Sequence, residues 1–315
     1  MFGNGWGRRK AGWLAVVTQG RQLTLAHVIR GPGVRPEICL LESFLIEKSE
    51  LEALQRLRSA RDLKSYACTT LMPPDEYDIA QIDTPKVPRE ERKAALRWAL
   101  KANVDYPLES ACLDVIDIPL DAAGSQPSVF AVTAAEARVR TRAALFDAAR
   151  IPLLAIDIAE LAQRNVAALF EEKNRGLMFL RLDEAGGLLT LTFRGELIAA
   201  RRIDVSALDL ADADAERCAQ RMERLVLELQ RSLDNFDRQY SSISISRLVI
   251  AVSPPVDGLA AALKESINLP VREMDLSSVM DFSAIPELRD TRHQARNVLA
   301  IGAALRTTGD NVEVA

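Results

Sequence analysis

The sequence predicts an α/β protein in which one architectural unit occurs twice, with a further subdomain inserted into the first copy. Each half of the chain has three strand-like segments separated by tight turns, followed by a helix and another strand. With 315 residues, of which 48% are hydrophobic, the chain is long enough for two lobes with substantial cores. We therefore expect two lobes with a cleft between them.

The first half opens with strands and a helix. Ser49 and Glu52 form a capping-box pattern, in which a hydroxyl and a carboxylate satisfy free amides at a helix start. We expect that helix to continue to about Arg61. Apolar runs between turn residues predict four strands, at Trp13–Thr18, Leu23–Ile29, Glu37–Phe44 and Tyr66–Met72.

Residues 76–155 are predicted to form the inserted subdomain, with the element order β-α-β-β-α-β. Its helices are expected at Arg89–Val104 and Ala135–Ala149, where apolar residues recur at helical spacing. A loop around Gly124 separates two of its strands. The strands are expected at Tyr77–Ile82, Ala111–Ile118, Ser128–Thr133 and Pro152–Asp157.

The second half repeats the pattern of the first. A helix over about Ile158–Glu171 leads into it, and apolar residues spaced by three and four predict a long helix over Ala213–Tyr240. Two further helices are expected, one from Gly258 and one over Arg292–Arg306. Strands are expected at Leu177–Leu182, Leu188–Phe193, Glu196–Ile203, Arg247–Val252 and Val271–Met274.

These elements divide the chain into four expected parts. They are a first lobe built from three separated segments, the inserted subdomain, a second lobe and a disordered tail. In that order they comprise residues 1–75, 156–175 and 292–306; 76–155; 176–291; and 307–315.

Charge and composition exclude several classes of protein. The formal net charge of −4 argues against the broad basic surface that most nucleic-acid-binding proteins need. No apolar run reaches about 18 residues, and the basic first residues lack a following apolar stretch, so we expect neither a membrane span nor a signal peptide. The four cysteines show no C-x-x-C pairing, which indicates a reduced, cytosolic compartment.

The sequence also lacks recognised catalytic and metal-binding patterns. Neither of the two histidines, His27 and His293, has a second ligand at metal spacing. There is no G-x-S-x-G and no G-x-x-x-x-G-K-[ST] motif. We therefore expect no catalytic residue and no metal site. Arg201 and Arg202, at the end of a predicted strand, are candidate anchors for an acidic partner.

Five short motifs carry a family resemblance through their order and spacing. They are the initial MFG, Pro88–Glu91, Tyr106–Glu109, Arg231–Phe236 and Ala300–Arg306. In this order they resemble PilM, the type IV pilus assembly family of the actin-like superfamily, and most closely its MSHA-pilus counterpart MshI. The resemblance covers nearly the whole chain. It implies an actin-like (ribonuclease H-like) duplicated fold with an inserted lobe.

The resemblance directs attention to three loops at the cleft. In ATP-using members the first hairpin has an aspartate followed by a glycine-rich turn that cradles phosphate. Here that strand contains no acid, and Val17 and Thr18 stand where the family has glycine and small polar residues, ahead of Gly20. A β-branched valine disfavours the positive φ that a close phosphate turn often needs. We expect this loop to have lost its phosphate contact.

The other two loops differ from the family pattern to different degrees. The second hairpin keeps Asp183, Gly186 and Gly187 with the glycines displaced, so a residual phosphate contact and an ordinary turn both stay open. In the third loop two prolines without amide donors follow Ser253, and Gly258 alone matches. We expect a vestigial cleft with no cofactor, and hence a pseudo-ATPase. Binding of ATP with magnesium is the alternative.

By resemblance, the protein is expected to be a scaffold on the cytosolic face of the bacterial inner membrane, peripherally associated with it. It would bind the cytosolic N-terminus of a PilN-like bitopic protein in a groove lined by about Val87–Leu120 and the facing first lobe. The assembly ATPase is a further expected partner, and Arg8–Lys10 is a candidate contact to anionic lipid. The alternatives are an actin-like protein that binds Mg-ATP and a type II secretion scaffold.

Overall fold

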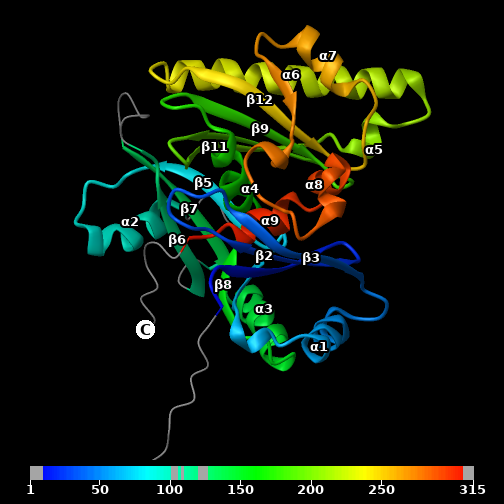
Figure 1. The fold of residues 1–315 in the computed structure, drawn as a ribbon. Coiled ribbons are helices and arrows are strands. Elements are labelled where there is room, and N and C mark those ends of the chain that lie inside the picture. The colour runs from blue at the N-terminus through cyan, green and yellow to red at the C-terminus, as the bar shows by residue number, and fades with distance from the viewer. Residues whose placement is uncertain (1–9, 101–105, 108–109, 120–126, 308–315) are drawn as a thin grey trace, which may run out of the picture.

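Three β-sheets organise the molecule. The structure, a computed structural model, describes residues 10–100, 106–107, 110–119 and 127–307. Two of the sheets have five strands each and the third has three. They form two large layers with a smaller sheet at one side (Figure 1).

The first sheet is built mainly from the N-terminal part of the chain. Its strands are β1 (Trp13–Gln19), β2 (Gln22–Ile29), β3 (Glu37–Leu45), β4 (Ala67–Leu71) and β8 (Leu153–Asp157). Their order is β3-β2-β1-β4-β8. The first three strands pair antiparallel, whereas β4 and β8 run parallel to β1.

The second sheet repeats this topology. Its strands are β9 (Gly176–Leu182), β10 (Gly187–Phe193), β11 (Glu196–Ile203), β12 (Ile245–Val252) and β13 (Val271–Glu273). Their order is β11-β10-β9-β12-β13, again with an antiparallel half and a parallel half. The predicted duplication of the architecture is therefore confirmed.

The small sheet forms the core of the insert. It contains β5 (Asp78–Asp83), β6 (Ala111–Asp117) and β7 (Ser128–Ala135) in the antiparallel order β5-β7-β6. Helix α2 (Arg92–Ala99) covers it with Leu96, which packs against Leu113 and Val129.

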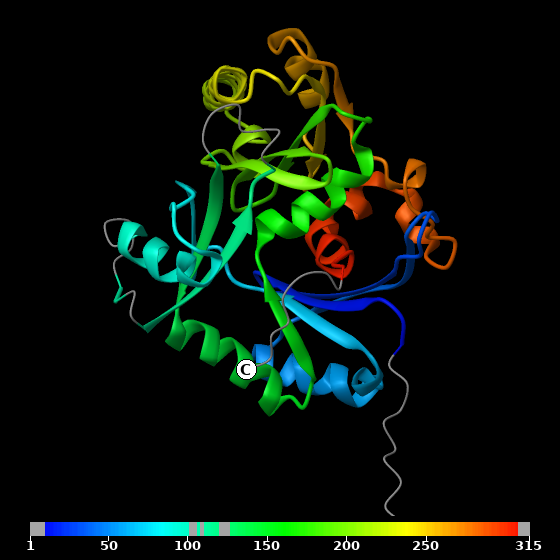
Figure 2. The same ribbon diagram turned by 90° about the vertical axis from the view of Figure 1, so that its left-hand side faces the viewer.

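Helices cover both faces of the two large sheets (Figure 2). The pair α4 (Ala159–Ala167) and α9 (Val298–Ala304) lies between the sheets and forms their shared core. On the outer side of the first sheet lie α1 (Glu50–Ala60) and α3 (Glu136–Ala148), and on that of the second lie α6 (Ala215–Gln239) and α7 (Leu259–Ser266).

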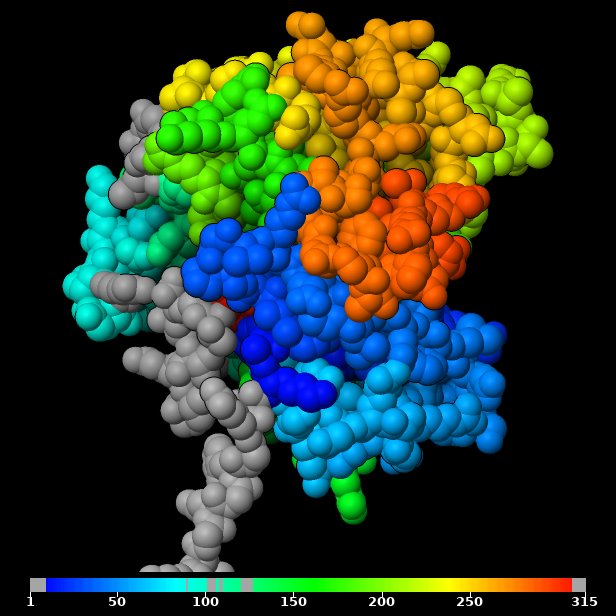
Figure 3. All heavy atoms as spheres, viewed as in Figure 1, coloured from blue at the N-terminus to red at the C-terminus, as the bar shows by residue number. Residues whose placement is uncertain are grey.

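Short helical segments complete the connections. They are α5 (Ala207–Leu210), α8 (Thr291–Arg296) and the 3-10 turns η1 (Leu63–Ser65), η2 (Arg89–Glu91), η6 (Ala168–Phe170), η7 (Leu276–Ser278) and η8 (Pro286–Arg289). The segment at Asp281 forms a parallel bridge to Glu37, so the two lobes meet directly on the face seen in Figure 3, where blue residues contact orange ones.

Local signals in the sequence explain where helices begin. The Ser49 hydroxyl accepts a bond from the Glu52 amide at the start of α1, and the Asp214 carboxylate accepts from two amides at the start of α6. Along α6 the apolar stripe is buried at Leu225, Leu229 and Phe236. The predicted long amphipathic helix is thus confirmed.

The insert is smaller than the predicted unit 76–155. Its element order is as predicted, but β8 pairs with β4 in the first sheet, and α3 packs on that sheet. Phe146 of α3 is 1% exposed and shares a core with Leu14 and Leu54 of the first lobe. This part of the domain assignment is therefore corrected, because burial of Phe146 requires the first sheet.

Other boundaries also differ from the predictions. The predicted 156–175 segment of the first lobe contains α4, which packs against α9 and against β9, β10 and β11 of the second sheet. The predicted helix 292–306 is two helices, because Asn297 leaves helical geometry with φ −104° and ψ 8°. Helix α2 ends at Ala99, while the predictions for 101–104, the Gly124 loop and the tail 308–315 lie outside the described residues.

Candidate functional site

A cavity of about 380 Å³ opens between the two large sheets. The three loops that the sequence singled out meet there: the β1–β2 turn, the β9–β10 turn and the segment after β12. Gly20, Asp183 and Ser253 contribute to its wall. The remaining lining residues are Gln19, Arg21, Gln22, Leu45, Arg181, Glu184, Ala185, Pro254, Ala295, Arg296 and Val298.

Two predicted residues of the first hairpin point away from this cavity. Val17 is 1% exposed and belongs to the core between the sheets. Thr18 donates its hydroxyl to Oε1 of Glu50 on α1, over 2.6 Å, on the outer side of the sheet. Gly20 has a φ of +56°, which the tight turn requires. The first loop therefore contributes its turn residues alone.

The second hairpin turns its backbone amides toward its own carboxylate. Oδ1 of Asp183 accepts bonds from the amides of Ala185, over 2.9 Å, and Gly186, over 3.1 Å. Oδ2 of Asp183 forms an ion pair with Nη1 of Arg181. Gly186 has a φ of +149°, and Gly187 begins β10 outside the cavity wall. Both carboxylate oxygens of Asp183 are therefore occupied within the hairpin.

The third loop closes the cavity with residues that donate little. The Ser253 amide donates to the Leu182 carbonyl over 3.0 Å, and Pro254 has no amide hydrogen. Gly258 caps α7 with a φ of +75° and does not line the cavity. Of the eight residues predicted at this site, the structure brings together Gly20, Asp183 and Ser253.

Comparison with solved structures identifies the architecture. A chain in the PilM–PilN type IV pilus biogenesis complex superposes with a TM-score of 0.74 at 20% identity, covering 94% of this chain and 98% of that chain. A Bacteroides thetaiotaomicron protein with an actin-like ATPase fold and unknown function matches with a TM-score of 0.48 at 10% identity, over 89% and 96%. This chain has the actin-like fold.

A further loose match is the cytoplasmic domain of EpsL, an inner-membrane component of the Vibrio cholerae type II secretion system. It has a TM-score of 0.47 at 10% identity and covers 91% of this chain and 94% of that chain. No protein-family model and no curated protein sequence matches the chain.

An actin-like fold implies a magnesium-bound nucleotide in this cleft, and the residues present do not fit such a group. A magnesium ion prefers free carboxylate oxygens, but those of Asp183 are already bound. A phosphate needs outward-facing amides, but those of Ala185 and Gly186 point inward. Among the described residues there is no cluster of three potential metal ligands.

A second polar cluster joins the insert to both sides of the actin-like core. Glu160 of α4 is 1% exposed. Its carboxylate accepts a hydrogen bond from the hydroxyl of Tyr77, at the entry to the insert. Arg202 of β11 approaches Glu160 at 3.5 Å and donates to the Pro74 carbonyl over 2.6 Å. Burial, and then the adjacent carboxylate, raise the pKa of Tyr77 well above its usual value.

The arginine pair predicted as an anchor for an acidic partner has partners within the chain. Arg201 pairs with Glu228 of α6 at 2.5 Å, and Arg202 pairs with Glu160. Each guanidinium is therefore already paired with a carboxylate of this chain. Sequence reasoning missed Glu160 and Arg181, because an isolated charge in an apolar segment does not reveal which distant group neutralises it.

The side of the insert that faces the first lobe carries an apolar cluster next to a sheet edge. Met72, Tyr77 and Ile158 are buried there, and Val132 and Ile156 pack against them. Strand β8 ends the first sheet, so one of its edges has no strand partner among the described residues. Leu154 on this strand is 41% exposed. The region thus combines open backbone groups with apolar side chains.

Proposed function

We propose that this protein is a non-enzymatic scaffold of a type IV pilus assembly platform, of the MSHA type. The carrying observation is the superposition on a chain of the PilM–PilN type IV pilus biogenesis complex along nearly the entire length of both chains. In this proposal the partner is a PilN-like protein with one membrane span, bound through its cytosolic N-terminus. The scaffold then lies at the inner face of the bacterial inner membrane, where the assembly ATPase is a further partner.

The proposed docking face lies between the insert and the first lobe. An extended peptide can pair its backbone with the open edge of β8, while apolar side chains enter between Leu154 and the cluster around Ile156 and Val132. The predicted lining over 87–120 adds α2, where Trp98 is 84% exposed. None of the described helices has the length and apolar character of a membrane span, so the proposed location depends on the partner's span.

The proposal includes a cleft that neither binds nor hydrolyses Mg-ATP. This part of the proposal is supported by the hydrogen bonds and the ion pair of the Asp183 carboxylate, and by Pro254, which has no amide hydrogen to donate. Val17, on the core side of β1, provides no polar group at the first loop. In this proposal the protein has no catalytic residue.

Binding of the full chain to the cytosolic N-terminal peptide of a PilN-like single-span protein from the same organism tests this function. We expect a soluble 1:1 complex by calorimetry or fluorescence anisotropy. Leu154→Glu should weaken that complex at least about tenfold, because a charge at a desolvated contact costs more than about 1.4 kcal/mol. Leu227→Glu is the matched control, since Leu227 is 44% exposed on α6, away from the proposed face.

Absence of any complex with wild-type protein would contradict the proposed function. Equal losses in the two variants would contradict the placement of the peptide alone. Deletion of residues 85–150 would not test the placement of the peptide. That segment includes α3, whose Phe146 fills the core of the first lobe, so the deletion would also disrupt this lobe.

A further inference from the structure

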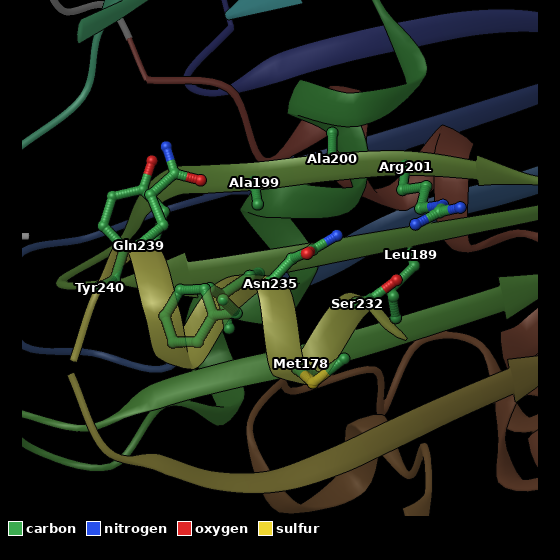
Figure 4. A pocket seen from close by; sticks show the side chains of 11 residues that line it. Met178, Leu189, Ala199, Ala200, Arg201, Ser232, Asn235, Gln239 and Tyr240 are labelled. Atoms are coloured by element: carbon green, nitrogen blue, oxygen red, sulfur yellow. The ribbon is translucent and has the colours of Figure 1, made fainter. Parts of the chain in front are cut away.

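We infer that the pocket between α6 and the second sheet binds a small neutral molecule with one aromatic ring, and that this ligand steadies the insert. The α6 pocket has a volume of about 150 Å³ and lies on the outer side of the sheet, away from the cavity between the lobes (Figure 4). This inference goes beyond the proposed scaffold function and does not depend on it.

The α6 pocket exists because two small side chains interrupt an apolar seam. The residues of α6 that face the sheet recur every three or four positions, and Ser232 stands in that row between Leu229 and Phe236. On the sheet, Ala199 of β11 pairs with Leu191 of β10, so a methyl group stands beside a leucine. Protein interiors have few voids larger than a water molecule, so an unfilled space of this size is unusual.

The inner walls of the α6 pocket are apolar and its mouth is polar. Five large side chains, each at most 5% exposed, form the walls: Met178, Leu189 and Leu191 from the sheet, and Phe236 and Tyr240 from the end of α6. At the mouth, Asn235 and Gln239 are exposed and extend toward β11 on either side of Ala199 (Figure 4). An apolar interior with a few polar groups at its edge is typical of small-molecule sites.

The polar groups at the mouth suit a neutral hydroxyl. Oδ1 of Asn235 accepts from Arg238, whereas Nδ2 of Asn235 and the side-chain amide of Gln239 have no hydrogen-bond partner among the described residues. These two amides offer a donor and an acceptor, which a phenolic hydroxyl can use together. Arg201 is the charged residue of the described lining, and Glu228 already pairs with it, so a charged ligand would find no unpaired counter-charge there.

The volume and the walls determine the class of ligand. About 150 Å³ is well below the roughly 300–1,000 Å³ of pockets that hold cofactors or drug-sized molecules, whereas an apolar cavity of about this size in another protein binds benzene. One six-membered ring therefore fits. The rings of Phe236 and Tyr240 and the sulfur of Met178 all make favourable contacts with an aromatic ring, so they favour it over a saturated one.

Tyr240 connects the α6 pocket to the insert. Its ring is part of the wall, and its hydroxyl accepts a bond over 2.7 Å from Nε2 of Gln81 on β5. The same nitrogen of Gln81 lies 3.1 Å from Oγ of Ser128 at the start of β7. A ligand packed against the Tyr240 ring restricts its movement, and we therefore expect an occupied pocket to hold β5 more firmly.

Calorimetric titration of the full-length protein with phenol tests the ligand class. We expect saturable 1:1 binding, with benzene at least about threefold weaker because it cannot use the amides at the mouth. Gln239→Ala should remove much of this difference. Ala199→Leu should abolish phenol binding without lowering Tm, because the leucine fills the empty space, and Ser232→Leu should do the same from the helix. Ala137→Leu, at an exposed position on α3, is the matched control and should bind phenol like the wild type.

Hydrogen exchange tests the link to the insert. Phenol should slow amide exchange in β5 of the wild type more than in β1, and should have no such effect in Ala199→Leu. Tyr240→Phe should still bind phenol but lose the slowing in β5, because it lacks the hydroxyl that contacts Gln81. No saturable phenol binding in the wild type, binding retained in both filled variants, or bound phenol without slower exchange in β5 would overturn the inference. Peptide binding is measured separately, so failure here leaves the proposed scaffold role standing.

Discussion

At the scale of single residues, Gly302 shows how closely the two central helices approach each other. A Cβ added at Gly302 of α9 would lie 2.0 Å from the carbonyl oxygen of Ala162 on α4. The Gly302 carbonyl also accepts a bond from the Asn165 amide group over 2.9 Å. Because the obstructing oxygen and carbon of Ala162, at 2.0 and 2.7 Å, belong to the backbone, no side-chain rotation can make room for a methyl group.

We predict that Gly302→Ala lowers the free energy of unfolding by about 1–3 kcal/mol, the usual cost of overpacking a dense core. Urea denaturation measures it. Gly31→Ala is the control, because a Cβ there meets its nearest atom, on the Val34 side chain, at an ordinary 3.8 Å. Equal stability of Gly302→Ala and the wild type would show that α9 can move away from α4.

At the scale of elements, helix α8 depends on the residue before it. The Asp290 carboxylate accepts a bond from the Arg292 amide over 2.9 Å and binds the Arg292 guanidinium through both oxygens. The guanidinium first, and then the amide, lower the pKa of Asp290 from 3.8 to about 2. The ionised form of this cap therefore favours the folded state.

This shift predicts a pH dependence with a definite sign. Because the folded-state pKa lies below the unfolded value, the contribution of Asp290 is present above about pH 4 and is lost as the pH falls toward about 2. We predict that Asp290→Asn loses less stability than the wild type between these pH values, by chemical denaturation. The control is Asp257→Asn, at an exposed aspartate, which should lose as much stability as the wild type over this pH range. An equally large loss in Asp290→Asn would show that the cap does not contribute.

At the scale of the whole molecule, the insert contacts both large lobes. The Tyr77 hydroxyl binds Glu160 of the central helix α4, and Arg202 of the second sheet packs on the Tyr77 ring. Farther along the insert, Gln81 donates to the hydroxyl of Tyr240, beside the pocket of about 150 Å³ between α6 and the second sheet (Figure 4). These contacts hold the insert in one orientation relative to the cleft.

We predict that Tyr77→Phe destabilises the protein by about 1–3 kcal/mol, because it removes a donor from the buried Glu160 carboxylate. In Tyr77→Phe, amide hydrogen exchange should accelerate relative to the wild type, and more strongly in β5 than in β1. Tyr66→Phe is the matched control, since that hydroxyl accepts an exposed bond from Lys10. Equal exchange in the two variants would argue against Tyr77 as an anchor of the insert.

Sequence patterns predicted local features well. The spacing of apolar residues anticipated α6, and the turns anticipated the β1–β2 and β9–β10 hairpins. The family resemblance directed attention to loops of which Gly20, Asp183 and Ser253 do meet. It did not anticipate that β8 joins the first sheet, because the pairing of Thr69 with Ala155 depends on how distant segments fold together.

What the sequence determined by itself is therefore the order of elements, their repetition and the chemistry each loop can provide: Pro254 has no amide hydrogen in any fold. What only the tertiary structure decided is where charges find partners. Asp183 could have faced a ligand, but Arg181 and two turn amides occupy its oxygens. The physical reason is that backbone propensities act over a few residues, whereas the neutralisation of a buried charge depends on groups that the fold brings within a few ångströms.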